Sequence, residues 1–315
     1  MDKWGEFSLR ALVTRRGNER ASKMAGVIDS IVGKYNYYVH ELADPRTAEF
    51  WGISNPFIIL SIVSAYLYFC KSFGPRFMEK RPAYELKNVL FVYNVFQVLF
   101  SIFIVYTGSY YIISKDYNLA CETIDYSNSP RAIGIAGAVW YYFFAKITEL
   151  LDTVFFILRK KNNQVTFLHV YHHTLMSLVI WFGVKYFPGG HSILMGYLNS
   201  IVHVIMYSYY LISSLGPEYQ KYVWWKKHVT MIQLIQFSII FVHNAAVFFY
   251  ECSYPRALNV LCLFNATAFL YMFGKFYINS YKQNNINKKK LEAQKVSPIV
   301  TNVSNVRRKV VEKTR

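Results

Sequence analysis

Charged residues, glycine and proline are scarce in this sequence. Only 17% of its 315 residues are charged, and it contains 15 glycines and nine prolines. The first fifty residues lack the apolar core of a secretory signal peptide, typically about 7–15 residues long, so we expect the first long apolar run to direct insertion. No internal repeat is evident. Hydrophobic residues make up 54% of the chain, with 27 tyrosines and 25 phenylalanines, a composition typical of a polytopic helical membrane protein.

The apolar residues gather in seven runs, at 53–70, 89–113, 132–158, 166–187, 191–214, 229–250 and 257–281. These runs predict an all-α polytopic membrane protein with a transmembrane domain over residues 51–281. Residues 1–50 are polar to amphipathic, and we expect a helix around 24–42 that is interfacial or flexible. Residues 282–315 predict a basic, disordered tail.

The net charge of +17 could indicate a nucleic-acid partner, but the basic residues lie in loops and tails. Lys and Arg concentrate at 71–88, 159–165, 215–228 and in the tail, whereas 114–131, 188–190 and 251–256 are poor in them. The positive-inside rule accounts for this pattern and places the first set and the C-terminus in the cytosol. An odd number of spans puts the N-terminus on the opposite side, although its own basic residues argue against that side. We expect no nucleic-acid partner.

Three histidines lie inside the fourth apolar run, as His169-Val-Tyr-His172-His173. Ionisable side chains are costly within a membrane span, so they mark a functional site by default. Positions i, i+3 and i+4 fall within one arc of about 100° on a helix, and the three rings therefore face one interior. An imidazole in such a place can be a metal ligand, a general base or a nucleophile.

Polar side chains recur on three other runs. The third run carries Lys146, Glu149, Asp152 and Thr153, the fifth carries Asn199, His203, Met206, Tyr207 and Tyr210, and the sixth carries Thr230, Gln233 and Gln236. A structural polar network accounts equally well for the set on the third run, and interhelical hydrogen bonds account for the set on the sixth. The histidine of the fifth run, next to a run with three more, favours a shared site.

A metal is one reading of these groups. A di-iron site of the desaturase kind needs several histidine clusters, and this chain has one; the other histidines are isolated, namely His40, His191, His203, His228 and His243. Glu149 and Asp152 could add carboxylate ligands, but the histidine count argues against a metal, and we predict none. A histidine that attacks an acyl thioester needs no metal. It needs a second base or donor, an oxyanion stabiliser and a dry tunnel.

Four stretches resemble, in the same order, the signature motifs of the very-long-chain fatty-acid elongases, the ELO family of 3-ketoacyl-CoA synthases. They are Lys146-x-x-Glu149-x-x-Asp152-Thr153, His169-x-x-His172-His173, His203-x-x-Met206-Tyr207-x-Tyr209-Tyr210 and Thr230-x-x-Gln233-x-x-Gln236. The histidine motif alone is shared with desaturases, whereas the four together are specific. The similarity covers about residues 50–281. It implies seven transmembrane helices, six forming an inverted barrel around an acyl tunnel, with the first helix outside.

The resemblance also implies a reaction. A long-chain acyl-CoA condenses with malonyl-CoA to give a 3-ketoacyl-CoA, CoA and carbon dioxide, with His172 as the acyl acceptor and His203 assisting acyl or proton transfer. Lys146 would hold the malonyl carboxylate or enolate. The residues expected to orient the imidazoles, stabilise the oxyanion or bind substrate are His169, His173, Glu149, Asp152, Asn199, Tyr207, Tyr210, Gln233 and Gln236.

The remaining expectations concern partners and location. No cofactor is expected. The expected partners are acyl-CoA, malonyl-CoA, membrane lipid and the other enzymes of the elongation cycle. The sequence does not define the oligomeric state, and a homo-oligomer is possible. The resemblance implies the endoplasmic reticulum membrane and a cytosolic C-terminus. Cys121 and Cys252 lie in loops of the acidic side and are predicted to form a lumenal disulfide, which the resemblance supports. The alternatives are a di-iron desaturase or hydroxylase, and a channel, receptor or transporter with a histidine-lined pore.

Overall fold

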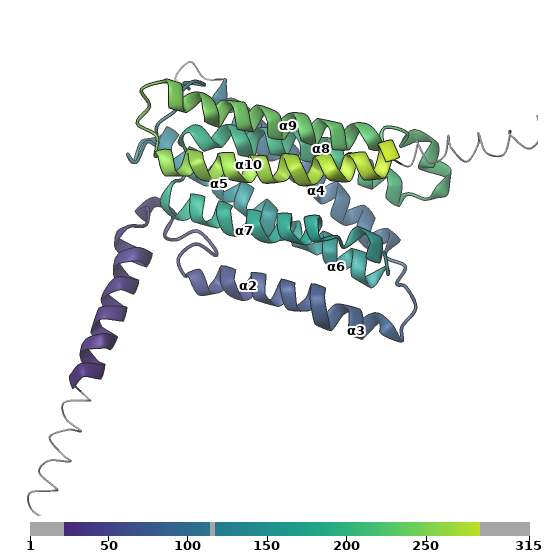
Figure 1. Cartoon of the computed structure of the whole chain (residues 1–315), viewed down its shortest axis with the longest axis horizontal. Helices are drawn as coiled ribbons and strands as arrows, with labels where there is room; N and C mark the ends of the chain where they lie inside the picture. Colours follow the sequence, from purple (N-terminus) through teal and green to yellow (C-terminus); the bar gives the residue numbers. More distant parts are fainter. Residues whose placement is uncertain (1–21, 114–116, 284–315) are drawn as a thin grey trace, which may run out of the picture.

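The computed structural model describes residues 22–113 and 117–283, and every regular element within those two ranges is helical. Within these ranges, seven long helical units, which we call rods, make up the bundle. Two of them consist of two consecutive helices, α2 (Pro56–Tyr68) and α3 (Gly74–Glu79) in one and α5 (Pro130–Thr148) and α6 (Leu150–Leu158) in the other. The other five are single helices: α4 (Lys87–Ile112), α7 (Phe167–Tyr186), α8 (Ile193–Ser214), α9 (Lys226–Ala246) and α10 (Arg256–Tyr277). The short segments are η1 (Tyr37–Glu41), η2 (Pro45–Thr47), η3 (Phe69–Phe73), η4 (Asn162–Gln164), η5 (Gly190–Ser192), η6 (Pro217–Tyr222), η7 (Val247–Phe249) and η8 (Ile278–Gln283). The rods lie side by side along one direction (Figure 1).

Five helices are long and apolar enough to cross a membrane: Pro56–Glu79, Lys87–Ile112, Phe167–Tyr186, Lys226–Phe249 and Arg256–Tyr281. The runs at 132–158 and 191–214 were also predicted to span, and the helices at these positions do not reach that standard. The first is divided between α5 and α6 at Glu149 and carries Lys146 and Asp152. The second carries Asn199 and His203, which lower the hydropathy of α8. The residues that build the site thus make these two helices less apolar.

Local sequence signals set where the rods begin. Asn55 precedes α2 and its side chain accepts a hydrogen bond from the backbone N–H of Phe57 at 2.9 Å, with Pro56 in the first helical position. At the start of α5, the hydroxyl of Ser129 accepts a hydrogen bond from the backbone N–H of Ala132, with Pro130 in the first helical position. Such caps satisfy N–H groups that have no partner within the helix. The caps fix where each rod starts along the axis of the bundle, and therefore where its polar residues lie along that axis.

The neighbours of each rod define the bundle. α4 packs against α5 and α8, α9 packs against α8 and α10, and α7 packs against α5 and α2. Phe269 of α10 contacts α7, with its ring centroid 5.0 Å from that of His172. α2 and α3 lie at an edge of the bundle (Figure 1). The core between the rods is built from large apolar side chains such as Ile59, Phe143 and Trp181.

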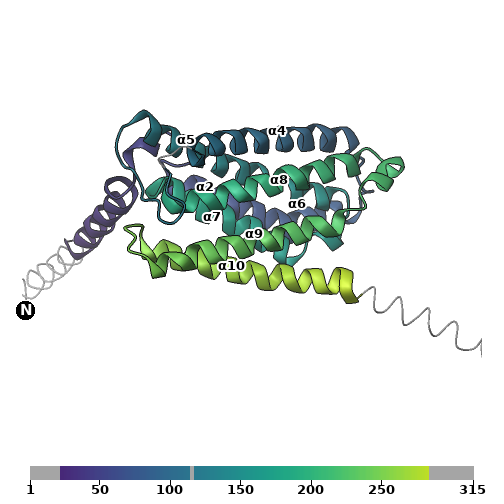
Figure 2. The ribbon, with the colours of Figure 1, turned by 90° about the horizontal axis from the view of Figure 1, so that it is seen from above.

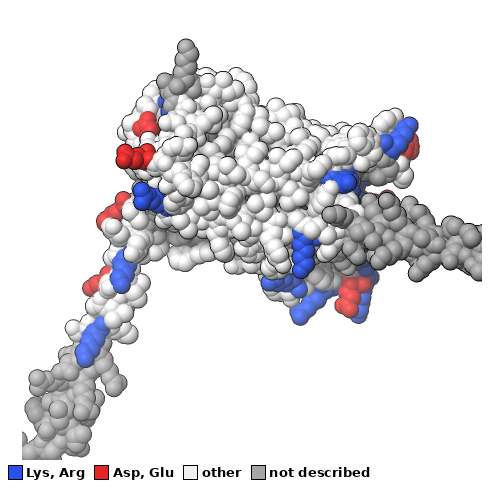
Figure 3. Space-filling model, turned by 45° about the horizontal axis from the view of Figure 1, so that its top comes forward, with Lys and Arg blue, Asp and Glu red and all other residues white. Residues whose placement is uncertain are grey.

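The loops separate by charge between the two ends of the bundle. The connections α3–α4, α6–α7 and α8–α9 and the end of α10 lie at one end, and α4–α5, α7–α8 and α9–α10 lie at the other (Figures 1 and 2). Figure 3 shows Lys and Arg gathered at the first end and a broad band without charged residues in the middle. The grouping follows the expected alternation of basic and acidic loops, and a charge-free middle band suits a bilayer.

A disulfide joins Cys121 of the α4–α5 connection to Cys252 of the α9–α10 connection, with 5.7 Å between the Cα atoms. We call the end of the bundle that carries it the disulfide end. Cys70 and Cys262 are buried thiols.

Replacing either disulfide cysteine should lower stability, because the bond closes a loop of 131 residues in the unfolded chain. We expect Cys121→Ser or Cys252→Ser to lose about 2–5 kcal/mol, measured by thermal melting of the detergent-purified protein under non-reducing conditions. The double variant is the internal control. Because both single variants remove the same disulfide, the double variant should lose no more stability than either of them. Additive losses in the double variant would show that the two thiols act separately.

Residues 37–54 form a segment that we call the N-terminal strap, and it packs on the bundle on both sides of the predicted boundary at residue 50. The backbone N–H of Asp44 donates to the carbonyl of Lys185 at 2.8 Å. The indole of Trp181 donates to the carbonyl of Gly52 at 2.8 Å, and the Lys185 ammonium donates to the carbonyl of Ile53 at 3.0 Å. The strap is therefore held on the end of α7.

Candidate active site

The histidine motif occupies the first two turns of α7. Thr166 caps this helix, and its hydroxyl accepts a hydrogen bond from the backbone N–H of His169 at 3.2 Å. The Nε2 atom of His169 lies 2.9 Å from the hydroxyl of Thr153 on α6, which lies 2.8 Å from the hydroxyl of Tyr66 on α2. His169 is therefore linked through Thr153 to a helix at the edge of the bundle.

His172 is the more exposed of the two histidines in the motif whose side chains form no hydrogen bond to the described residues, the other being His173. Its side chain is partly buried and makes no hydrogen bond to any residue in the described part of the chain. Its ring centroid lies 5.0 Å from Phe269, 6.2 Å from Phe273 and 5.4 Å from His173. His173 is buried and packs with its ring centroid 4.4 Å from His169. The imidazole nitrogens of His172 are thus available to a ligand, beside an aromatic wall from α10.

A buried ion pair lies at the end of α5. The ammonium of Lys146 donates to both carboxylate oxygens of Glu149, at 2.8 and 2.9 Å, and to the side-chain oxygen of Asn199 at 2.8 Å. An ammonium has three N–H bonds, and these contacts use all of them. The predicted contact of Lys146 with a substrate anion would require one of these three hydrogen bonds to break. The geometry instead makes Lys146 the residue that holds Glu149.

Glu149 connects this ion pair to α8. Its Oε1 lies 3.0 Å from Nδ1 of His203, and the exposed fractions of Glu149 and His203 are 1% and 6%. A carboxylate can only accept, so Nδ1 of His203 donates and the lone pair of the neutral ring lies on Nε2. The chain Lys146–Glu149–His203 therefore fixes both the orientation and the tautomer of the second histidine.

Asp152 forms a separate contact one turn further on. The hydroxyl of Tyr207, which is fully buried, donates to Oδ2 of Asp152 at 2.6 Å. Tyr210 packs against Tyr207 with ring centroids 5.8 Å apart, and Tyr93 of α4 lies 6.2 Å away on the other side. The face predicted for the third run thus divides: Glu149 and Asp152 bind α8, and Thr153 binds α7.

The predicted stripe on α9 is only partly engaged. Gln233 donates to the sulfur of Met206 at 3.6 Å, which links α9 to α8. Gln236 is buried, and its Oε1 has no hydrogen-bond partner among the described residues. His243 lies at the disulfide end, where it stacks on His191 with centroids 3.7 Å apart. Of these three residues, Gln233 is the one with a hydrogen-bond contact to α8 within the described part of the chain.

Sequence reasoning missed Tyr142. Its hydroxyl donates to the same Asn199 oxygen at 2.9 Å, and the Lys146 ammonium lies 4.7 Å from the centre of its ring. The available signal was its spacing, because Tyr142 precedes Lys146 by four residues and so lies one turn away on the same face. Gln97 of α4 was also missed; it donates to the hydroxyl of Thr148 at 3.1 Å and is buried.

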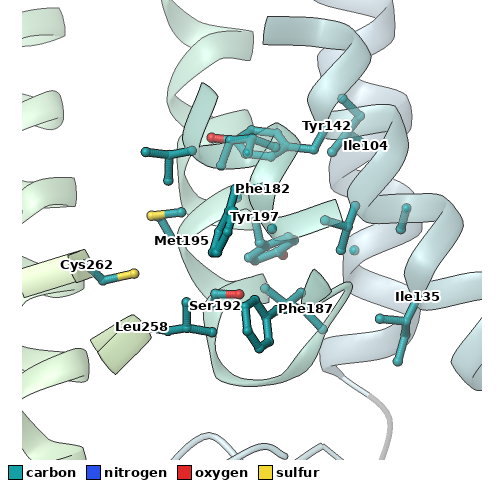
Figure 4. A pocket seen from close by; sticks show the side chains of 18 of the residues that line it. Ile104, Ile135, Tyr142, Phe182, Phe187, Ser192, Met195, Tyr197, Leu258 and Cys262 are labelled. Carbon is teal, nitrogen blue, oxygen red and sulfur yellow. The ribbon is translucent and has the colours of Figure 1, made fainter. Parts of the chain in front are cut away.

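An apolar pocket extends from Tyr142 toward the disulfide end, among α4, α5, α7, α8 and α10 (Figure 4). It encloses about 900 Å³ of space, part of it open to solvent. Its lining is mainly aliphatic and aromatic and includes Ile104, Ile135, Phe182, Phe187, Met195 and Leu258. Tyr142 belongs both to this lining and to the polar network around Lys146. The pocket can take a long apolar group whose polar end lies at the network.

Within residues 22–113 and 117–283, no group of three or more His, Cys, Asp and Glu side chains is arranged to hold a metal ion. The polar residues of the site bind one another instead. The arrangement offers an unengaged imidazole, a second imidazole oriented by a carboxylate, and an apolar pocket.

Comparison with known proteins places the sequence in a family. The model of the ELO: GNS1/SUR4 family matches residues 51–290. Very long chain fatty acid elongase 7 of Rattus norvegicus is 45% identical over 242 residues, which cover 76% of this chain and 86% of that protein. Very long chain fatty acid elongase 4 of Homo sapiens is 43% identical over 245 residues, 77% of each chain. A very long chain fatty acid elongase of Aedes aegypti is 42% identical over 257 residues, covering 81% of this chain and 72% of its own.

Proposed function

The chain belongs to the ELO: GNS1/SUR4 family of fatty-acid elongases, and we propose that it condenses a long-chain acyl-CoA with malonyl-CoA. The observation that carries this proposal is the state of His172. Its ring faces Phe269 without a hydrogen bond to the described residues, and it is more exposed than His173, the other histidine of the motif without such a bond; His203 is bound to Glu149. A nucleophile must have a free lone pair, and His172 offers one.

The apolar pocket would hold the far end of the acyl chain. The six helices α4, α8, α9, α10, α7 and α5, each packed on the next, would form the barrel, and all of them except α9 line the pocket. Helix α2 would remain outside as the first of seven spans. The thioester would lie near His172, and the CoA would extend to the end with the basic loops, which suit its phosphates. We place that end and the C-terminus in the cytosol, and the protein in the endoplasmic reticulum membrane.

The first half-reaction transfers the acyl group to the protein. A nitrogen of His172 attacks the thioester carbonyl, the new C–N bond forms as the C–S bond breaks, and CoA leaves with the proton that the imidazole gives up. An acyl-imidazole remains activated, so the chain is held for the second substrate. A dry, apolar surrounding keeps the imidazole neutral and excludes water that would hydrolyse the intermediate.

The second half-reaction forms the carbon–carbon bond. Malonyl-CoA loses carbon dioxide, and the electron pair of the broken bond forms an enolate that attacks the acyl carbon. The C–N bond then breaks, and His172 takes up one proton to regain its neutral form. His203 lies on the neighbouring α8 and, oriented by Glu149, presents the lone pair of Nε2 to accept a proton; once protonated, Nε2–H can donate a hydrogen bond to the developing oxyanion.

The remaining polar residues would position these two histidines. Lys146 and Asn199 hold Glu149, which holds His203, and Thr153 holds His169 beside His173. Tyr207 and Asp152 brace the same helices. Malonyl-CoA, acyl-CoA and membrane lipid would be the direct partners, and the other enzymes of the elongation cycle would take the 3-ketoacyl-CoA.

The direct test is an assay of the purified protein with both CoA substrates. We expect equal amounts of 3-ketoacyl-CoA, free CoA and carbon dioxide, with one proton consumed in each turnover. Metal analysis of the same sample distinguishes the condensing enzyme from a di-iron desaturase. About two irons per chain, together with oxygen-dependent desaturation, would refute condensation. A pore protein would bind or pass its solute without consuming either thioester.

Filling the pocket should shorten the acyl chains that the enzyme accepts. Ala138 lines the pocket on α5, and Ala138→Phe adds a ring where the chain would lie. We expect kcat/KM for the longest accepted acyl-CoA to fall by about tenfold or more, while shorter substrates change little. Ile133→Phe is the matched control, because Ile133 is 47% exposed on the outside of the same helix. Equal losses for all chain lengths would show that the pocket does not hold the chain.

A further inference from the structure

The helix at residues 22–36 carries an apolar surface that the described part of the protein leaves uncovered. The side chains of Met24, Val27, Ile28, Ile31 and Val32 have exposed fractions of 64%, 57%, 52%, 61% and 50%. At about 100° per residue these five positions fall within an arc of about 140° on one side of the helix. We call them the N-terminal stripe. Asp29 and Ser30 lie on the opposite side, and Lys23 and Lys34 lie beside the edge of the stripe.

This helix has few means of stability on its own. It is short, and it contains Gly26 and Gly33, which lower helix propensity. Isolated helices of this length are marginal in water, and most helices in proteins are stabilised by covering an apolar face. The N-terminal stripe therefore requires a covering surface. The segment also lies outside residues 51–290, which the family model matches.

The position of the helix indicates what covers it. Figures 1 and 2 show it leaving the disulfide end of the bundle and running steeply across the direction of the rods. Tyr35 lies one turn beyond Ile31 on the same side as the stripe. Its ring stacks on Phe57, with centroids 6.3 Å apart and an angle of 17° between the planes. Phe57 is 60% exposed in the first turn of α2, one of the candidate membrane spans.

We propose that residues 22–36 form a helix that lies on the bilayer surface at the disulfide end, with the N-terminal stripe buried in lipid. Lipid that surrounds the exposed Phe57 is continuous with the space beside Tyr35, so the bilayer meets the stripe without any further partner. Tyr37 and Tyr38 are exposed at the junction with the strap and suit the headgroup level, where tyrosine is enriched. The charged side faces water, as amphipathic surface helices require.

The test uses the full-length protein in phosphatidylcholine nanodiscs that hold one chain each. Ile28→Cys and Ser30→Cys place an environment-sensitive fluorophore on the stripe and on the charged side of the same turn. The native Cys70 and Cys262 are buried, and the wild type labelled in parallel gives their background. We expect the probe at 28 to be blue-shifted and quenched severalfold more strongly by brominated lipid than the probe at 30. Aqueous iodide should give the reverse order.

Two results would overturn the proposal. Equal access of iodide to both probes, without an effect of brominated lipid, would show that the stripe faces water. Protection of position 28 from both quenchers would show that protein covers it. Neither result depends on catalysis, so this test stands apart from the assay of condensation.

Discussion

Replacing His172 with alanine should abolish condensation, with kcat lowered by about 10³-fold or more, as expected when a covalent nucleophile is removed. The release of CoA from acyl-CoA alone should also disappear. The fold should persist, because His172 is only partly buried and has no hydrogen bond to the described residues. The measurements are steady-state turnover, the CoA burst, and the melting temperature of the same preparation.

His203→Ala is the matched control. This variant removes the histidine bound to Glu149 and should slow both half-reactions while leaving the acyl-accepting nitrogen in place. A slow but complete CoA burst in His203→Ala, with none in His172→Ala, supports the assignment of the two roles. The opposite pattern would make His203 the nucleophile.

Lys146→Met should be the most destabilising single substitution at the site. It leaves the carboxylate of Glu149 buried, at 1% exposure, without its cation. Removing one partner of a buried ion pair costs about 3–5 kcal/mol, so we expect a large loss of melting temperature together with loss of activity.

The double variant Lys146→Met/Glu149→Gln separates the two effects. It removes both charges and keeps a side-chain oxygen that can accept from His203, so most of the stability should return. Activity should remain low by about 10²–10⁴-fold, because the carboxylate that supports His203 is absent. Full activity in the double variant would show that the ion pair is only structural.

The helices were the most predictable part of the fold. Apolar runs long enough to cross a bilayer marked the position of each rod, and Asn55-Pro56 marked the start of α2. The break at Glu149 was not predicted, because nothing in the local pattern distinguishes it from a continuous helix. The strap was also missed: Asp44 and Thr47 are buried against the bundle although both are polar and lie outside the apolar runs. Such burial depends on contacts with residues far along the chain.

Helical spacing predicted the general position of the site but not its pairings. The i, i+3, i+4 rule brought His169, His172 and His173 to one side of α7. It could not tell which of them would find a partner, since that depends on Thr153 and Phe269 from other helices. Lys146 was expected to meet a substrate anion because the nearby acceptor Asn199 could not be placed without the packing of α5 on α8.

The central claim is that His172 carries the acyl group between the two substrates. It is tested most directly by incubating the wild type with acyl-CoA alone, then digesting the protein and measuring the peptide masses. The account predicts release of up to one CoA per active site and the acyl mass on a peptide containing His172, which disappears when malonyl-CoA is added. No covalent adduct, with CoA released only when both substrates are present, would contradict it and would make His172 a general base.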